Sequence, residues 1–421
     1  MLHSRRWSIG FSFGLAALAC SEATAPNGSP AIKLLAISAG AFHACGITPG
    51  DSTVCWGSTA LGVSGTLATR PVVVTTLPGA TAIAAGGTNA CALAAGRLYC
   101  WGQLTEVNSA PSWRRTLPDT VPGGAVFGNV TTSLHDCALA VTGAAYCWGQ
   151  NDNGELGIGS LATSFDSTPL AVAGGITFAS VSAGPWHSCG LTAGGQAYCW
   201  GDNQVGELGD TSAAMDSTCG YFANRLCAPT PVPVQGGLQF RSVAAGGLFS
   251  CGVTIAGKGY CWGWNPEGSL GTPFASGHCI WPTGSTPTVG DTEPCARFPI
   301  PVQLDGPGSD SLFAEISVGP GHACALTTGG RVFCWGTNYS GELGRGDTTR
   351  YGCGSETPCV PRARLVLHAP GSWVHVTAGG DFTCGLTADH TAYCWGSGGG
   401  NLGNGGTTPA YFPVAVLTPV P

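Results

Sequence analysis

The tripeptide Cys-Trp-Gly occurs seven times along this chain of 421 residues, and no other feature limits the possible folds so strongly. A motif that recurs every few tens of residues is typical of repeat proteins, in which each copy is one supersecondary unit. The repeats are therefore expected to form one continuous array rather than several unrelated domains. The cysteines of the seven copies are Cys55, Cys100, Cys147, Cys199, Cys261, Cys334 and Cys394.

A second cysteine precedes each tripeptide, ten residues earlier in six copies and nine in the second. A hairpin with the turn Ala193-Gly194-Gly195 places Cys189 opposite Cys199, and the shorter turn Ala95-Gly96 does the same for the second copy. Opposed Cβ atoms on antiparallel strands lie roughly 4.5–5.5 Å apart, close to disulfide geometry. We predict seven hairpin disulfides rather than metal sites, because zinc-ligand spacing is absent. The upstream cysteines are Cys45, Cys91, Cys137, Cys189, Cys251, Cys324 and Cys384.

Six of the seven remaining cysteines fall as local pairs in three loops, which predicts three further disulfides: Cys219 with Cys227, Cys279 with Cys295, and Cys353 with Cys359. Cys20 is then left over from the total of 21. Residues 1–19 carry Arg5 and Arg6, a short apolar stretch and a final Ala17-Leu18-Ala19, and they resemble a bacterial lipoprotein signal. We expect residues 1–19 to be a signal peptide and residues 20–30 to be an acylated Cys20 with a linker. The chain would then be extracytoplasmic, lipid-anchored to a bacterial membrane or secreted.

The composition favours an all-β domain. The chain contains 68 Gly and 29 Pro, and only 9% of its residues are charged, whereas long helices prefer Ala, Leu, Glu, Lys and Arg. Short Pro/Val segments between the repeats, such as residues 231–234, supply one further strand each. We predict that residues 31–421 form a single seven-bladed β-propeller of four-stranded antiparallel blades. The ring would be closed by the C-terminal strand, residues 411–416, completing the first blade.

The repeat text also resembles a known family. Residues 183–209 and 319–344 join an Ala/Val-Gly-x-x-His half to a Trp-Gly-x-Asn-x-x-Gly-x-Leu-Gly half. This pattern is similar to the regulator of chromosome condensation repeat family, and the resemblance implies the propeller fold. Its eukaryotic founder is similar to a nuclear exchange factor for a small GTPase. A secreted bacterial relative of similar fold inhibits β-lactamases, and this analogy suits an exported chain better.

No residue set predicts catalysis. His43, His135, His187 and His322 stand two residues before a cysteine, but Phe249 and Phe382 occupy the same slot in other repeats. A position that accepts Phe is expected to be a packing position rather than a metal ligand. The net charge is −7 and no basic cluster is present, which argues against nucleic-acid binding. We expect a protein without enzymatic activity, cofactor or metal.

Three insertions, residues 210–230, 272–298 and 345–362, follow the tripeptides of adjacent repeats and should lie on one face. Aromatic and Arg side chains there would be the anchors of an interface. We expect a monomer that binds a protein or glycan at the cell envelope and meets the membrane only through its lipid. The alternative for the loops is that they are decoration. The alternatives for the function are an envelope enzyme acting on glycans and a purely structural envelope component. The expected anchors are Tyr221, Phe222, Arg225, Trp264, Phe274, Trp281, Arg297, Arg350 and Tyr351.

Overall fold

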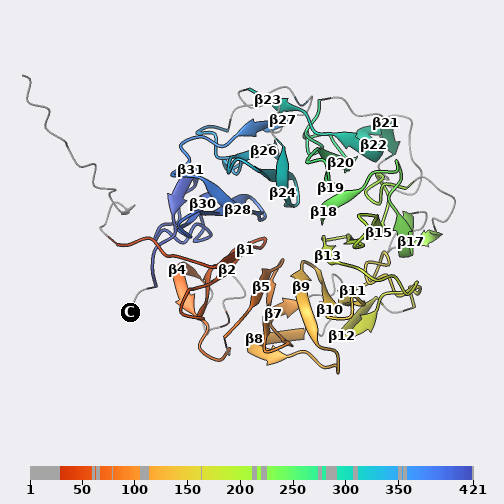
Figure 1. The fold of residues 1–421 in the computed structure, drawn as a ribbon, viewed down its shortest axis with the longest axis horizontal. Coiled ribbons are helices and arrows are strands. Elements are labelled where there is room, and N and C mark those ends of the chain that lie inside the picture. The colour runs from red at the N-terminus through yellow and green to blue at the C-terminus, as the bar shows by residue number, and fades with distance from the viewer. Residues whose placement is uncertain are drawn as a thin grey trace, which may run out of the picture.

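The computed structural model describes residues 29–58, 62, 67–77, 79–104, 113–162, 164–210, 216–219, 225–273, 277–280, 292–306, 312–348, 353 and 358–419. Seven β-sheets follow one another around a ring, and the described residues contain no helix (Figure 1). Each sheet has four antiparallel strands as its basic unit, so the predicted seven-bladed β-propeller is confirmed. None of the described segments is a helix of the length and apolar character needed to cross a membrane.

The blades follow the order of the chain. Blade one contains β1 (Ala36–Ala39), β2 (His43–Ile47), β3 (Thr53–Gly57) and β4 (Ala68–Val73). Blade two contains β5 (Ala82–Ala85), β6 (Asn89–Ala94), β7 (Arg97–Leu104) and β8 (Trp113–Thr120). Blade three contains β9 (Phe127–Thr132), β10 (His135–Ala140), β11 (Ala145–Gln150) and β12 (Phe165–Ala171). Blade four contains β13 (Ser180–Ala183), β14 (His187–Leu191), β15 (Ala197–Asp202), β16 (Asp216–Cys219) and β17 (Arg225–Pro233).

The last three blades repeat the arrangement. Blade five contains β18 (Phe240–Ala245), β19 (Phe249–Thr254), β20 (Gly259–Trp264), β21 (Gly277–Ile280) and β22 (Thr292–Pro301). Blade six contains β23 (Leu304–Asp305), β24 (Phe313–Val318), β25 (His322–Thr327), β26 (Val332–Thr337) and β27 (Cys359–Leu365). Blade seven contains β28 (Trp373–Ala378), β29 (Phe382–Thr387), β30 (Ala392–Gly396) and β31 (Ala410–Ala415).

The Cys-Trp-Gly tripeptide has the same structural role in every blade. Its cysteine lies directly opposite the upstream cysteine, as Cys189 does opposite Cys199, and a disulfide joins each of the seven pairs. Its Trp is completely or almost completely buried. Its Gly has a positive φ, +109° at Gly201, where the pairing with the outer strand shifts register. A side chain there would clash with the backbone of His187, so glycine is required.

Each of these tryptophans packs against the preceding blade. Trp262 of blade five, for example, lies in a core cluster with Leu191 and Cys199 of blade four. Its indole Nε1 donates to the Glu207 carbonyl oxygen of blade four at 2.9 Å. The same bond joins four other tryptophans to the preceding blade, and the blades are therefore held together by one repeated contact. The four other pairs are Trp56–Asn401, Trp200–Glu155, Trp335–Ser269 and Trp395–Glu342.

The expected closure of the ring is wrong in its detail. The C-terminal strand β31 does not complete blade one, because it pairs with β30 and is the outer strand of blade seven. Blade one has its own outer strand, β4, since the outer strand of every blade follows the Cys-Trp-Gly tripeptide in the chain.

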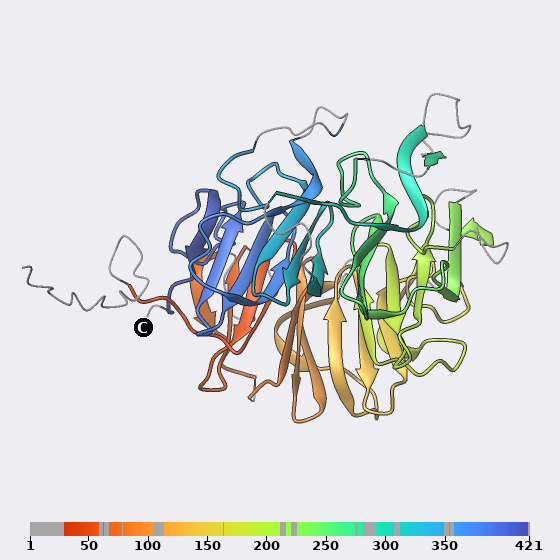
Figure 2. The same ribbon diagram turned by 45° about the horizontal axis from the view of Figure 1, so that its top comes forward.

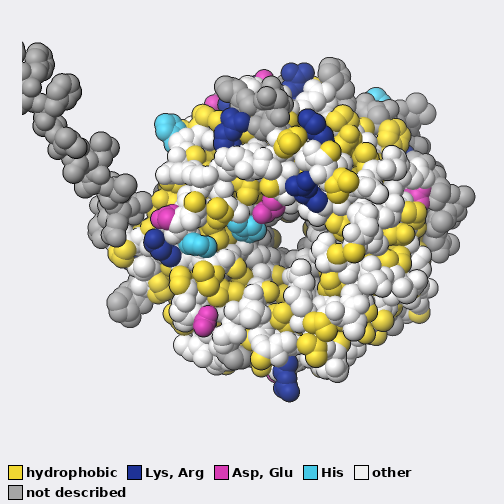
Figure 3. All heavy atoms as spheres, in the orientation of Figure 1, with side chains coloured by type: hydrophobic (Ala, Val, Ile, Leu, Met, Phe, Trp, Pro, Cys, Tyr) yellow, Lys and Arg dark blue, Asp and Glu magenta, His cyan; other side chains and the backbone are white. Residues whose placement is uncertain are grey.

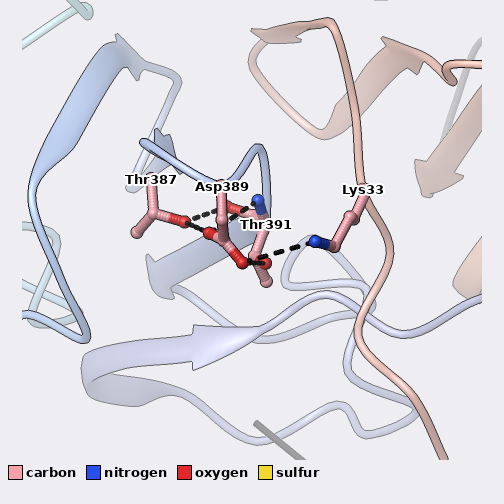
Figure 4. A network of polar contacts seen from close by, with 4 residues as sticks. All are labelled: Lys33, Thr387, Asp389 and Thr391. Carbon is pink, nitrogen blue, oxygen red and sulfur yellow. Dashed lines mark hydrogen bonds and ion pairs between the residues drawn. The ribbon is translucent and has the colours of Figure 1, made fainter. Parts of the chain in front are cut away.

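The N-terminal segment closes the ring instead. Ile32 N donates to Val416 O at 2.8 Å and Leu34 N donates to His390 O at 2.9 Å, so residues before β1 cross onto blade seven. Lys33 Nζ lies 3.6 Å from Asp389 Oδ2, and Asp389 also accepts the hydroxyls of Thr387 and Thr391 (Figure 4). The hydrogen bond from Thr387, and then that from Thr391, lowers the pKa of the Asp389 carboxyl group. The ion pair is exposed, so the closure depends on the main-chain bonds.

Candidate functional site

The two ends of the propeller differ in which connections they carry. One end, here called the hairpin face, carries the turns of the disulfide hairpins and the links between blades. The other end, here called the insert face, carries the turns between the first and second strands and the connections from third to outer strands. The described ends of the three insertions belong to the latter connections, so these ends lie on one face. Figure 2 shows green-to-teal segments of blades four and five rising beyond the ring on one side.

The stems of the insertions are built alike. In blades four and five an additional strand, β16 or β21, pairs with the outer strand. Disulfides Cys219–Cys227 and Cys279–Cys295 join these strands, and Cys353–Cys359 joins the third insertion to β27. The second cysteine of each pair lies at the same register position, opposite Asp202, Trp264 or Thr337. Three adjacent blades therefore carry disulfides at equivalent positions on the insert face.

Of the expected anchors, Trp264 and Arg297 can be placed. Trp264 is partly buried with Val205, Leu248 and the Cys279–Cys295 disulfide. The backbone of Arg297 lies against Gly206 of blade four. Both residues therefore hold the blade-five insertion against blade four. Arg225 begins β17, and its side chain is outside the described set. Cys20 and the anchors Tyr221, Phe222, Phe274, Trp281, Arg350 and Tyr351 also lie outside the described residues.

Sequence reasoning missed exposed aromatic residues on the insert face. Tyr339 is 52% exposed in the connection after β26, and Phe42 is 51% exposed in the turn after β1. Phe298 is 47% exposed as well, but it lies within the outer strand β22 and not in a connection. The Tyr339 hydroxyl donates to Glu267 Oε1 of blade five at 3.2 Å, which links two neighbouring connections. The available signal was an aromatic residue within an Asn-x-x-Gly turn, where the fourth repeat has Gln204.

The first strands of the seven blades line a central channel of about 460 Å³, visible as the hollow in Figure 3. Glu315 is the one carboxylate among its described lining residues. His375 Nδ1 lies 2.8 Å from Glu315 Oε1, and His375 Nε2 lies 3.2 Å from Ile37 O of blade one. Burial opposes protonation of His375, but the hydrogen bond and charge of Glu315 together with the Ile37 carbonyl outweigh burial, and the pKa of His375 is raised. Glycoside hydrolysis by the usual mechanism uses two carboxyl groups, so the described lining supplies one of the two.

The repeated histidines occupy a buried polar position between blades. His135 Nε2 lies 2.5 Å from Ser188 Oγ, and His322 Nε2 lies 2.9 Å from Thr383 Oγ1 in the following blade. Ser188 and Thr383 in turn donate to the carbonyl oxygens of Glu155 and Glu342. Burial lowers the pKa of His135 to about 3 and that of His322 to about 4, so both imidazoles are neutral at physiological pH.

One group of described residues has the donor types of a metal site: Cys91, Cys100 and Asp136. Its two cysteines form a disulfide, so they offer no thiolate. Asp136 Oδ1 accepts a hydrogen bond from Asn89 Nδ2 at 2.7 Å. Burial raises the pKa of Asp136 to about 7 despite this bond. The group is explained by packing between blades two and three.

Comparison with known proteins identifies the repeats. The family model described as the Regulator of chromosome condensation (RCC1) repeat matches residues 142–191, 194–253 and 329–386. A second model of the same description matches residues 178–207, 313–342 and 373–401. The chain is 27% identical over 413 residues to the ultraviolet-B receptor UVR8 of Arabidopsis thaliana, covering 94% of this chain and 83% of the receptor.

Other relatives share a smaller part or the fold alone. The probable E3 ubiquitin-protein ligase HERC6 of Homo sapiens is 30% identical over 220 residues, which are 51% of this chain and 18% of the ligase. Yeast RCC1 (Prp20), solved bound to Kap60, has a TM-score of 0.68 at 18% identity, covering 98% of this chain and 91% of that one. Prp20p of Saccharomyces cerevisiae, examined for its binding to Gsp1p and histones, has a TM-score of 0.67 at 19% identity, with coverages of 91% and 87%.

Proposed function

Because the chain belongs to the regulator of chromosome condensation repeat family, we propose that it is a protein-binding module that works outside the cytoplasm. Its partner would bind on the insert face, over blades four to six. The observation that carries this proposal is the set of three equivalent disulfides, Cys219–Cys227, Cys279–Cys295 and Cys353–Cys359, on three consecutive blades.

Two physical arguments support the location and the surface. Ten disulfides in one chain are consistent with an oxidising compartment, because cytosolic thiols are kept reduced. A loop that is constrained by a disulfide loses less conformational freedom on binding than an unconstrained loop. More of the free energy of its contacts therefore appears as affinity. The exposed Tyr339 of blade six adds aromatic area to the same surface.

The relatives support a protein as the class of partner. Yeast RCC1 binds Kap60, and the binding of Prp20p to Gsp1p and histones has been examined, so this fold presents surfaces to proteins. An exported chain would meet a different partner, at the cell envelope or beyond. The proposal includes a lipid anchor on Cys20, which incorporation of labelled palmitate into the intact chain but not into Cys20→Ala would support. Equal labelling of both would contradict the anchor alone.

A crosslinking experiment tests the binding surface. A photoreactive amino acid at position 339 on the insert face should capture a partner from the extracytoplasmic proteins of the source cells. The matched control places it at position 141, because Val141 is 69% exposed in a hairpin turn on the opposite face. We expect a defined adduct from position 339 and none of that mass from position 141.

A trimmed chain completes the test. Short Gly-Ser links would replace residues 211–224, 274–291 and 349–357, and Cys227, Cys295 and Cys359 would become Ser. Mass spectrometry would verify the seven hairpin disulfides. The trimmed chain should lose the adduct at position 339. Retention of the same adduct, or its appearance from position 141, would show that the insertions do not form the binding surface.

A further inference from the structure

A second hollow lies on the hairpin face, between blades five and six. It has a volume of about 560 Å³ and is formed by the hairpin turn of blade five, the link between the blades, and the edge of blade six. This volume is in the range of ligand pockets, which is roughly 300–1,000 Å³. We call this hollow the basic groove. Its lining includes Lys258, Tyr260, Gln303, Leu304, Phe313 and Arg362.

The charge of the basic groove contrasts with that of the whole chain. Lys258 and Arg362 are both exposed and both line it, although the chain has a net charge of −7. The carboxylate of Asp305, beside the groove, is already bound at 2.6 Å by Arg364. Neither Lys258 nor Arg362 has a carboxylate within ion-pair distance among the described residues. Figure 3 shows Lys and Arg side chains gathered over the region of β18–β27 on the displayed face.

An equivalent hollow elsewhere in the ring provides an internal comparison. It lies between blades two and three, has a volume of about 500 Å³, and is lined by residues 95–98 and 120–127. Arg97 occupies the hairpin position that Lys258 occupies in blade five, but the described lining there contains no second cation. Gln196 occupies the corresponding position of blade four, where its carbonyl oxygen accepts from Thr192 N as that of Lys258 accepts from Thr254 N.

We propose that the basic groove binds an acidic segment of a polypeptide, with one carboxylate at Lys258 and another at Arg362. The groove also has apolar lining, from the half-buried Leu304 and from the more deeply buried Val302 and Phe313. A peptide that alternates acidic and apolar side chains matches this pattern, whereas a sulfated or uronate polymer has charges without aliphatic side chains. Because the groove is on the hairpin face, this proposal is independent of the insert-face function.

Titration of the folded, oxidised chain with a fluorescent peptide that alternates Glu and Leu tests the proposal. The paired control peptide has Gln in place of Glu. We expect binding of the Glu peptide that disappears at about 0.5 M NaCl, where the screening length falls to about 4 Å. Lys258→Gln and Arg362→Gln should each weaken binding roughly five- to tenfold, as expected for charge-assisted contacts.

The matched control is Arg97→Gln, which removes the same charge from the same hairpin position of blade two. It should leave the affinity unchanged. Since Gln196 already occupies this position in blade four, Lys258→Gln should fold, and an unchanged melting temperature would verify it. An equal loss of affinity in Arg97→Gln would show that binding depends only on the net charge of the protein, which would contradict a specific groove. Equal affinity for the Gln peptide, no binding of the Glu peptide, or tighter binding of a heparin fragment that Lys258→Gln weakens would overturn the proposal.

Discussion

His187 Nε2 in blade four lies 2.7 Å from Ser250 Oγ in blade five, and both residues are completely buried. The Ser250 hydroxyl donates to Glu207 O at 2.8 Å, so its oxygen accepts the proton of His187 Nε2. Trp262 Nε1 donates to the same carbonyl oxygen at 2.9 Å. One interface therefore contains a chain of polar contacts that runs from blade four to blade five and back.

The residues of this interface are matched around the ring. His or Asn is followed in the next blade by a polar partner in four interfaces, Asn89–Asp136, His135–Ser188, His187–Ser250 and His322–Thr383. Phe249 is followed by Ala323, and Phe382 by Ala44. A polar residue thus meets a polar one and an apolar residue meets a small one, as burial requires. The first interface, His43 with Ala90, departs from this rule.

Removing the hydroxyl of Ser250 should destabilise the protein. Ser250→Ala leaves the buried Nε2–H of His187 without its acceptor, and the expected cost is about 2 kcal/mol in the free energy of unfolding. Urea denaturation of the oxidised protein measures this value. A cost below about 0.5 kcal/mol would mean that the contact does not contribute to stability.

The double variant His187→Phe, Ser250→Ala should recover part of that loss, because it recreates the Phe–Ala pair that blades five and six already use. A double-mutant cycle should give a coupling of roughly 1–2 kcal/mol between the two positions. Additive losses would refute the matching of the two residues.

Glu155 should make stability depend on pH. Burial raises its pKa from 4.5 to about 8, so the folded chain binds a proton that the unfolded chain releases above 4.5. The associated stability is complete below pH 4.5 and is lost as the pH rises through 8. Glu155→Gln should therefore gain stability relative to the natural chain between pH 5 and pH 8. Measuring the free energy of unfolding of both proteins at pH 5 and pH 8 isolates the contribution of Glu155. An equal pH dependence in the two proteins would contradict the prediction.

The two kinds of disulfide should differ in their effects. Cys189 and Cys199 are buried and pack within the core that contains Trp262. Replacing both by Ala should cost about 2–3 kcal/mol of unfolding free energy. Cys353→Ser with Cys359→Ser should cost less, about 1–2 kcal/mol, because this disulfide joins cysteines only 6 residues apart, and it should weaken capture at position 339. Thermal unfolding and the crosslinking yield check the two effects separately.

Glycines from several blades pack closely around the mouth of the channel on the insert face. A Cβ at Gly379 would lie 2.5 Å from Gly40 O in blade one and 2.8 Å from the Phe382 ring. Because the ring is closed, neither blade can move away, and Gly379→Ala should cost about 3 kcal/mol. Gly124→Ala is the control, since a Cβ there meets nothing within 4 Å. Equal melting temperatures for both variants would contradict the claim that close packing requires glycine at position 379.

The parts of the fold that depend on neighbouring residues could be predicted from the sequence. A separation of nine or ten residues is enough to bring Cys91 to Cys100 or Cys189 to Cys199 in a hairpin. The polar interfaces could not be predicted in this way, because His187 and Ser250 are 63 residues apart. The histidine position itself can be predicted to pack, because Phe occupies it in other repeats, whereas its partner belongs to the next blade.

The number of blades, the hairpins and their disulfides follow from local sequence, because each repeat specifies a β-hairpin that needs no information from distant residues. The closure of the ring, the blade to which β31 belongs and the buried groups that meet across the interfaces depend on tertiary packing. Tertiary packing also decides that Lys258 and Arg362, 104 positions apart, line one groove. These features depend on the order of the strands within a blade and on the packing of one blade against the next, and both are properties of the assembled ring.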